Sequence, residues 1–261
     1  MRHARAMFAA AAAVLLGLAA GKAPAAEAFQ SLVRKVDAKL YYPQQSGMRS
    51  LQADVQSSLL DEQIAGSPDA KKVKLTYYWA APYKQRFVLS GVPDSMSDQA
   101  QRFERQLAMW GERLVPKPLE LTLADYKCTV GENDKAFTID AQATSPSARI
   151  ESMKYAIDKK TLLPTPWQLS TSSWSADTEI KYEQAPGGLA VPVEMKAKAD
   201  QNELTLKFAY KTVEKLYLPE SLTVSFTGGD GARTNTLRLS NFKINQPLPA
   251  DVFPVAKEGR P

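Results

Sequence analysis

The sequence predicts a mainly β protein of the α+β class: a single large curved antiparallel sheet, or half-barrel, with helices covering its concave face. Three observations lead to this prediction. Apolar and polar residues alternate with a period of two along most of the chain, which is typical of strands with one buried and one exposed face. Gly, Asn, Asp and Pro cluster between these stretches at intervals of about 10–15 residues, which favours hairpins. Two other stretches repeat apolar residues at helical spacing.

Residues 1–25 have the pattern of a cleaved secretory signal. Arg2 and Arg5 give a positive start, residues 7–20 are nearly all Ala, Leu and Val, and Ala23-Pro24-Ala25 is a small-residue cleavage site. The apolar run of about 14 residues is shorter than the roughly 20 needed to span a bilayer, and an uncleaved membrane anchor is the alternative. We therefore expect an exported, soluble periplasmic protein with no transmembrane span, whose residues 26–261 form one domain.

Two helices are predicted in this domain. Residues 27–42 repeat apolar side chains at helical spacing and end before Pro43. The second helix has an apolar stripe that ends before Pro116 and consists of Met96, Ala100, Phe103, Leu107, Trp110 and Leu114. Such a stripe packs on a core or forms a lid over a cavity, because both roles require the same amphipathicity.

About thirteen strands are predicted from the alternating stretches. The segments between the expected strands are rich in Gly, Asn, Asp and Pro, which favour turns; the Gly-rich run at 228–231 is an example. The expected strands are 51–56, 72–79, 87–89, 119–123, 126–130, 137–143, 150–157, 167–171, 178–182, 191–199, 204–212, 222–226 and 237–244.

The rare residues exclude common catalytic classes. The one histidine, His3, lies in the expected signal, so the mature chain has none for a Ser-His-Asp triad, a Cys-His pair or a metal site. The one cysteine, Cys128, lies on the apolar side of its strand and is interpreted as a buried, unreactive thiol. No nucleotide-binding glycine motif is present, and no spacing singles out a pair of carboxylates. We predict no catalytic residue, no metal and no cofactor.

The net charge does not indicate a nucleic-acid partner. It is +5 for the whole chain, but loss of Arg2, Arg5 and Lys22 with the signal leaves 30 basic and 28 acidic residues. Basic residues alternate with acidic ones along the strands, which is typical of solvated sheet faces rather than of a phosphate-binding stripe.

Large apolar side chains are the candidates to line a cavity in the concave face. They occupy alternating strand positions or the stripe of the second helix, and a fully packed core is the alternative. An apolar cavity would bind acyl chains through burial of area, with few polar contacts. The candidate ligand-binding residues are Tyr77, Trp79, Phe87, Leu89, Phe103, Leu107, Trp110, Phe137, Trp167, Phe208 and Phe226.

Three short motifs resemble a known family. They are Leu75-Thr-Tyr-Tyr-Trp79-Ala-Ala-Pro82-Tyr-Lys-Gln-Arg86-Phe87, Ala156-Ile-Asp158 leading to Leu163-Pro164, and a C-terminal segment that runs from Leu239-Ser-Asn-Phe242 to Phe253-Pro254. Together they are similar to the periplasmic outer-membrane lipoprotein carriers and sorting proteins, the LolA/LolB-like family. The resemblance implies a half-barrel closed by helices around a cavity for acyl chains. Carriers of this family place an Arg directly before the Pro, where it holds the lid; here that residue is Ala81, and Arg86 lies beyond Pro82.

The function predicted from these features is a non-enzymatic, monomeric periplasmic carrier or binder of lipid or lipoprotein acyl chains. The first alternative is an envelope sensor or protein-interaction module on the same fold, with envelope proteins as partners. The second is a carboxylate-based hydrolase. No nucleic-acid partner is expected.

Overall fold

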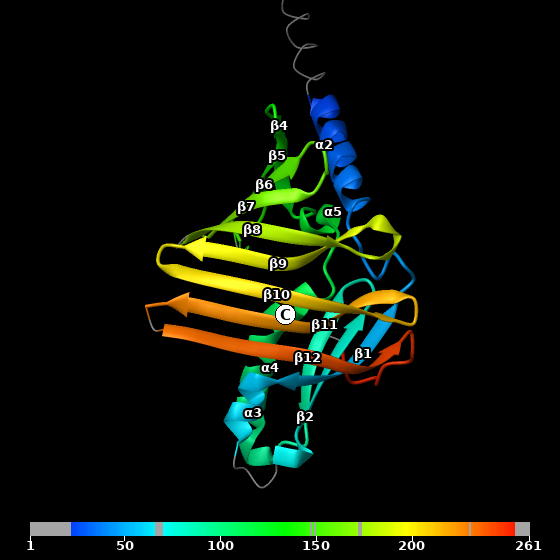
Figure 1. Cartoon of the computed structure of the whole chain (residues 1–261), viewed down its shortest axis with the longest axis vertical. Helices are drawn as coiled ribbons and strands as arrows, with labels where there is room; N and C mark the ends of the chain where they lie inside the picture. The colour runs from blue at the N-terminus through cyan, green and yellow to red at the C-terminus, as the bar shows by residue number, and fades with distance from the viewer. Residues whose placement is uncertain are drawn as a thin grey trace, which may run out of the picture. The chain divides into compact units, whose positions relative to one another are not determined.

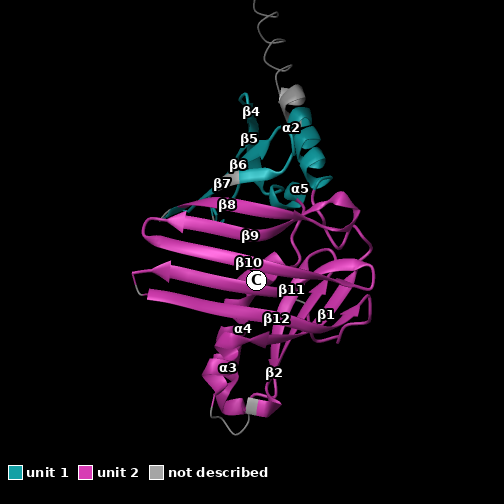
Figure 2. Ribbon diagram, in the orientation of Figure 1, with its two compact units in different colours: residues 1–39, 119–175 teal, residues 40–118, 176–261 magenta. Residues whose placement is uncertain are grey.

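A computed structural model describes residues 22–65, 70–146, 148, 150–171, 174–229 and 231–253. The chain divides into two compact units (Figure 2): residues 1–39 with 119–175 form the first unit, and residues 40–118 with 176–261 form the second. Residues 1–21 of the expected signal lie outside the described residues, and the single domain over 26–261 stays a prediction.

The second unit contains an antiparallel sheet in the order β3-β2-β1-β12-β11-β10-β9-β8. The N-terminal strands join the C-terminal hairpins through β1 and β12, where Val55 pairs with Leu239. Figure 1 shows β9 to β12 running across the view while β2 runs steeply, so the sheet of this unit is bent. Its strands are β1 (Ser50–Ser57), β2 (Lys74–Ala80), β3 (Lys84–Ser90), β8 (Ser175–Gln184), β9 (Ala190–Ala199), β10 (Asn202–Val213), β11 (Leu216–Gly228) and β12 (Gly231–Ile244).

One face of this sheet forms the core of the second unit. In β2, Leu75, Tyr77 and Trp79 are buried while the residues between them are more exposed, as the alternation predicts. The helix α4 (Ser97–Leu114) packs on β3 and reaches β11, and Figure 1 shows it behind β10 to β12. Its buried side chains include Phe103 and Leu107, so the predicted stripe faces the sheet.

The first unit contains four strands in the order β7-β6-β5-β4 and two helices. The helix α2 contacts both α5 and β4. Apolar residues of β5 and β6, such as Ile139 and Ile157, are fully buried. The elements are α2 (Lys22–Asp37), α5 (Leu119–Thr122), β4 (Tyr126–Glu132), β5 (Ala136–Ala143), β6 (Ser152–Asp158) and β7 (Pro164–Ser170).

One strand prediction and one helix prediction need correction. The strand predicted over 119–123 is instead the one-turn helix α5 (Leu119–Thr122), because Asp37 accepts hydrogen bonds from the backbone N–H groups of Leu119 and Glu120 at 2.8 and 3.1 Å. These bonds satisfy donors that a first helical turn leaves free. The helix predicted over 27–42 ends at Asp37, since Tyr41 instead donates its backbone N–H to Ala190.

Four short elements complete the second unit. The helix α3 (Ser58–Ile64) follows β1 directly and was not predicted. The 3₁₀ turns η1 (Ala70–Lys72) and η2 (Asp94–Met96) precede β2 and α4, and η3 (Pro186–Gly188) forms the β8–β9 turn. Twelve strands therefore lie within the described residues, one fewer than expected.

Cys128, predicted as a buried, unreactive thiol, is less buried than expected. Cys128 lies on the better-covered side of β4, as the alternation predicts, but its side chain is only half-buried because β4 is the edge strand of its unit. This partial burial raises the pKa of the Cys128 thiol.

The predicted fold class, a mainly β protein whose large antiparallel sheet carries a few helices, is confirmed. Within the described ranges, no helix is both long enough and apolar enough to cross a bilayer.

Candidate functional site

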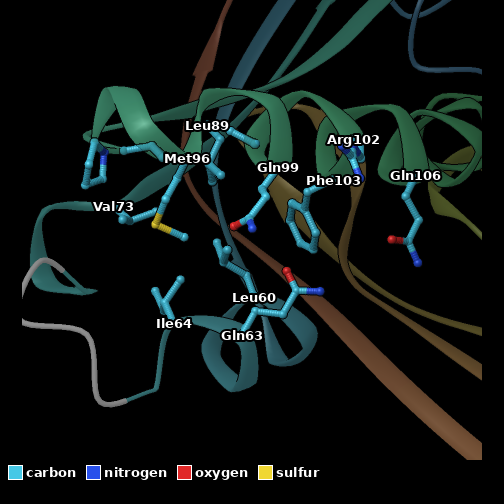
Figure 3. Close-up of a pocket in the computed structure, with 13 residues that line it drawn as sticks. Leu60, Gln63, Ile64, Val73, Leu89, Met96, Gln99, Arg102, Phe103 and Gln106 are labelled. Carbon is cyan, nitrogen blue, oxygen red and sulfur yellow. The ribbon is translucent and has the colours of Figure 1, made fainter.

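A pocket of about 390 Å³ lies between α3, α4 and the end of β3 in the second unit. Figure 3 shows Leu60, Gln63 and Ile64 of α3 facing Met96, Gln99 and Phe103 across the opening. Its volume lies within the range of small-molecule sites. Nine of its thirteen lining residues are apolar, namely Leu60, Ile64, Val73, Leu89, Val92, Pro93, Met96, Ala100 and Phe103; the other four are Gln63, Gln99, Arg102 and Gln106.

Hydrogen bonds to β12 hold α3 at the pocket. The Asn235 carboxamide oxygen accepts from the Ser58 hydroxyl at 3.0 Å and from the Leu59 N–H at 3.1 Å. Ser57 caps the helix by accepting from the Leu60 N–H at 3.3 Å. Since Leu60 and Ile64 are four residues apart, both lie on the helix face that lines the pocket.

Polar contacts with β2 and β3 hold α4. A carboxylate oxygen of Glu104 accepts the backbone N–H of Leu89 at 2.7 Å, which satisfies a donor of the edge strand β3. The Tyr77 hydroxyl donates to the Gly111 carbonyl at 3.1 Å, and burial, followed by the charge of Glu112, raises the pKa of Tyr77. This hydroxyl is therefore protonated, and can act as a donor, at any physiological pH.

Gly111 allows the C-terminal half of α4 to approach β3 closely. A Cβ atom at this position would lie 2.8 Å from Gln85 Oε1 and 3.0 Å from Phe87 Cε2. Phe87 is buried, so it has little room to move away. The interior glycine thus fixes the distance between the helix and the strand that together form one wall of the pocket.

Arg86 joins three segments of the second unit. Its guanidinium donates to the Val252 carbonyl at 3.0 Å and lies 3.7 Å from the Glu104 carboxylate. The arginine beyond Pro82 therefore contacts α4, although the residue directly before Pro82 is Ala81.

The predicted site residues fall into separate places. Leu89 and Phe103 line the pocket. Tyr77, Trp79, Phe87, Leu107 and Phe208 are buried in the core, and Tyr77 packs on Phe87 with ring centroids 5.0 Å apart. Trp110 is half-buried on α4. That any of these residues contacts a ligand stays a prediction.

Three further candidates lie away from this pocket. Phe226 is 38% exposed near the end of β11. Phe137 of the first unit is half-buried, with the Lys159 ammonium 5.3 Å from its ring centroid. Trp167 lies on β7 opposite Tyr155, and its side chain is outside the described part of the structure.

The pocket is also lined by residues that are not among the predicted ligand-binding residues. Met96 and Ala100 belong to the predicted stripe of the second helix, so helical phase alone relates them to Phe103. Leu60 and Ile64 could not be found in this way because α3 was not predicted.

Within the described ranges, no group of three or more His, Cys, Asp or Glu side chains is arranged to hold a metal ion.

No protein-family model matches the sequence, and no curated protein is similar to it. Solved structures are similar at low identity. A LolA superfamily protein from Nitrosomonas europaea is 10% identical over 87% of this chain and 97% of that chain, with a TM-score of 0.35. A putative outer membrane lipoprotein-sorting protein domain from Vibrio parahaemolyticus is 12% identical over 84% and 93%, also with a TM-score of 0.35. The MucA/MucB complex structure from Pseudomonas aeruginosa has a chain that is 10% identical over 84% and 98%, with a TM-score of 0.21. The first two carry the names of the lipoprotein-sorting family that the sequence motifs resemble.

Proposed function

We propose that this protein is a non-enzymatic binder or carrier of the acyl chains of lipids or lipoproteins, and that the chain occupies the pocket between α3, α4 and β3. The observation that supports this proposal best is the lining, which is apolar at nine of thirteen positions and contains no carboxylate. Such a lining favours a hydrocarbon, with few polar contacts to orient it.

The number of methylene groups that the pocket buries sets the expected affinity. Each methylene group that leaves water contributes about 0.8 kcal/mol. Burial of about eight methylenes would supply ~6 kcal/mol, which corresponds to a dissociation constant of tens of micromolar. This affinity suits a protein that accepts a chain and later releases it.

The expected setting is the periplasm, with the protein exported by the signal over residues 1–25 and acting as a monomer. A carrier in this compartment must shield acyl chains from water between two membranes. The lipoprotein-carrier motifs at 75–87 and 239–254 agree with this role.

A pair of alanines on α4 provides the test. Ala100 lines the pocket, whereas Ala108 is exposed on the same helix and does not line it. We expect Ala100→Trp to fill part of the 390 Å³ and to weaken the binding of a fluorescent fatty acid. Loss of room for two methylenes alone lowers affinity about tenfold.

The matched control is Ala108→Trp, which should bind as the wild type does. Circular dichroism verifies that both variants are folded. Equal binding by the two variants would place the acyl site elsewhere. If the wild-type protein binds no fatty acid but recovers an envelope protein, the alternative of a protein-interaction module is favoured instead.

A further inference from the structure

The polar lining of the pocket is concentrated along one flank of α4. Gln99, Arg102 and Gln106 follow one another at steps of three and four residues, so they form a continuous stripe on the helix. Met96, Ala100 and Phe103 lie on the adjacent face of the same helix. The pocket therefore has an apolar side and, next to it, a row of hydrogen-bond donors.

The charge of this row is not compensated. Among the described residues, Arg102 has neither an ion-pair partner nor a hydrogen-bond acceptor, whereas Arg86 has both Glu104 and the Val252 carbonyl. The nearby acidic residues, Asp61 and Glu62 of α3, Asp94 of η2 and Asp98 of the first turn of α4, do not line the pocket. An uncompensated guanidinium at the rim of an apolar pocket favours an anion beside an apolar chain.

We infer that the ligand of this pocket is a single-chain amphiphile with an anionic head group, such as a carboxylate or a phosphate ester. The hydrocarbon occupies the side formed by Met96, Ala100 and Phe103. Arg102 binds the head group, because a guanidinium donates two parallel N–H groups to an oxyanion. The carboxamides of Gln99 and Gln106 can donate to the same oxygens. This inference rests on the proposed acyl-binding function and specifies the chemical class of its ligand.

A matched ligand series tests the inference on the wild-type protein. Tetradecanoate, a tetradecyl phosphate, tetradecanol and tetradecyltrimethylammonium share a chain length and differ in head-group charge. Each displaces the neutral probe N-phenyl-1-naphthylamine below its micelle concentration. We expect both anions to bind about fivefold more tightly than the alcohol at low salt, and the difference to shrink at high salt. Inorganic phosphate should not displace the probe, since it has no chain.

Two arginines of α4 provide the matched variants. Arg102→Gln should abolish the preference for anions over tetradecanol, and Arg102→Lys should retain only part of it, because an ammonium group keeps the charge but not the two parallel N–H groups. Arg105, which is exposed on α4 and does not line the pocket, gives the control Arg105→Gln, which should keep the full preference. If R102Q and R105Q lose the preference for anions equally, the assignment of Arg102 as the residue that binds the head group is overturned.

The remaining outcomes separate this inference from the function on which it rests. Equal affinity of the wild type for the anions and the alcohol overturns the anionic head group but keeps acyl binding. If inorganic phosphate alone displaces the probe, the inference that the ligand is an amphiphile is overturned. Failure of all four chain ligands to displace the probe overturns both proposals.

Discussion

Replacement of Glu104 with alanine removes a short polar contact between α4 and the edge strand β3. The Leu89 N–H, which donates to Glu104 at 2.7 Å, then has no acceptor from the helix. The Glu104 side chain is only 16% exposed, so water replaces it poorly. A hydrogen bond to a charged acceptor contributes about 1.5–3 kcal/mol, whereas the 3.7 Å pair with Arg86, which is 40% exposed, adds about 0–1 kcal/mol. We expect Glu104→Ala to lower the free energy of unfolding by about 2 kcal/mol.

Glu104→Gln provides the matched comparison. Its carboxamide oxygen can still accept from Leu89, so we expect it to lower the free energy of unfolding by only about 1 kcal/mol. Urea denaturation followed by circular dichroism measures both losses, and hydrogen exchange of the Leu89 amide reports the contact itself. This amide should exchange faster in E104A than in E104Q. Unchanged exchange in E104A, or equal destabilisation by both variants, would refute the role assigned to Glu104.

Two further substitutions test packing and a turn. Gly111→Ala gains about 1 kcal/mol of helix propensity, but its Cβ meets Gln85 and Phe87 at 2.8 and 3.0 Å, and overpacking costs about 1–3 kcal/mol. We expect a net loss of about 1 kcal/mol in urea denaturation; a net gain would contradict the close approach. Asp158 accepts bonds from the backbone N–H and hydroxyl of Thr161 and the N–H of Lys160, which lower its pKa. A lowered folded-state pKa stabilises the fold above the unfolded value of about 3.9, and this contribution is lost as pH falls. Between pH 5 and pH 3, the free energy of unfolding measured in urea should therefore fall less for Asp158→Ala than for the wild type. Equal falls for the two proteins would disprove this role.

The strands were predictable because each has one buried and one solvated face. In β2 the residues from Leu75 to Trp79 alternate without interruption, and tertiary structure agrees with that pattern. The helix α4 was predicted for the same reason at helical spacing, and Pro116 limits its C-terminal end.

The errors arise where distant residues decide the local structure. Residues 119–123 alternate as a strand would, but Asp37, which is far away in sequence, caps the helix α5 over Leu119–Thr122. The helix α3 depends on Asn235 of β12 in the same way. Because the pocket lies between α3 and α4, the sequence predicted apolar residues of α4 and β3 but not the wall that completes it.

The most direct test of the central claim is photocrosslinking of a diazirine-labelled fatty acid to the purified protein, followed by mass spectrometry of tryptic peptides. Cleavage after Arg86 and Arg102 releases residues 87–102, which contain Leu89, Met96 and Ala100. The account predicts that this peptide carries most of the label, that unlabelled fatty acid competes, and that Ala100→Trp reduces the label. Labelling concentrated on peptides of β9 to β12, or unchanged labelling in the Ala100 variant, would contradict it.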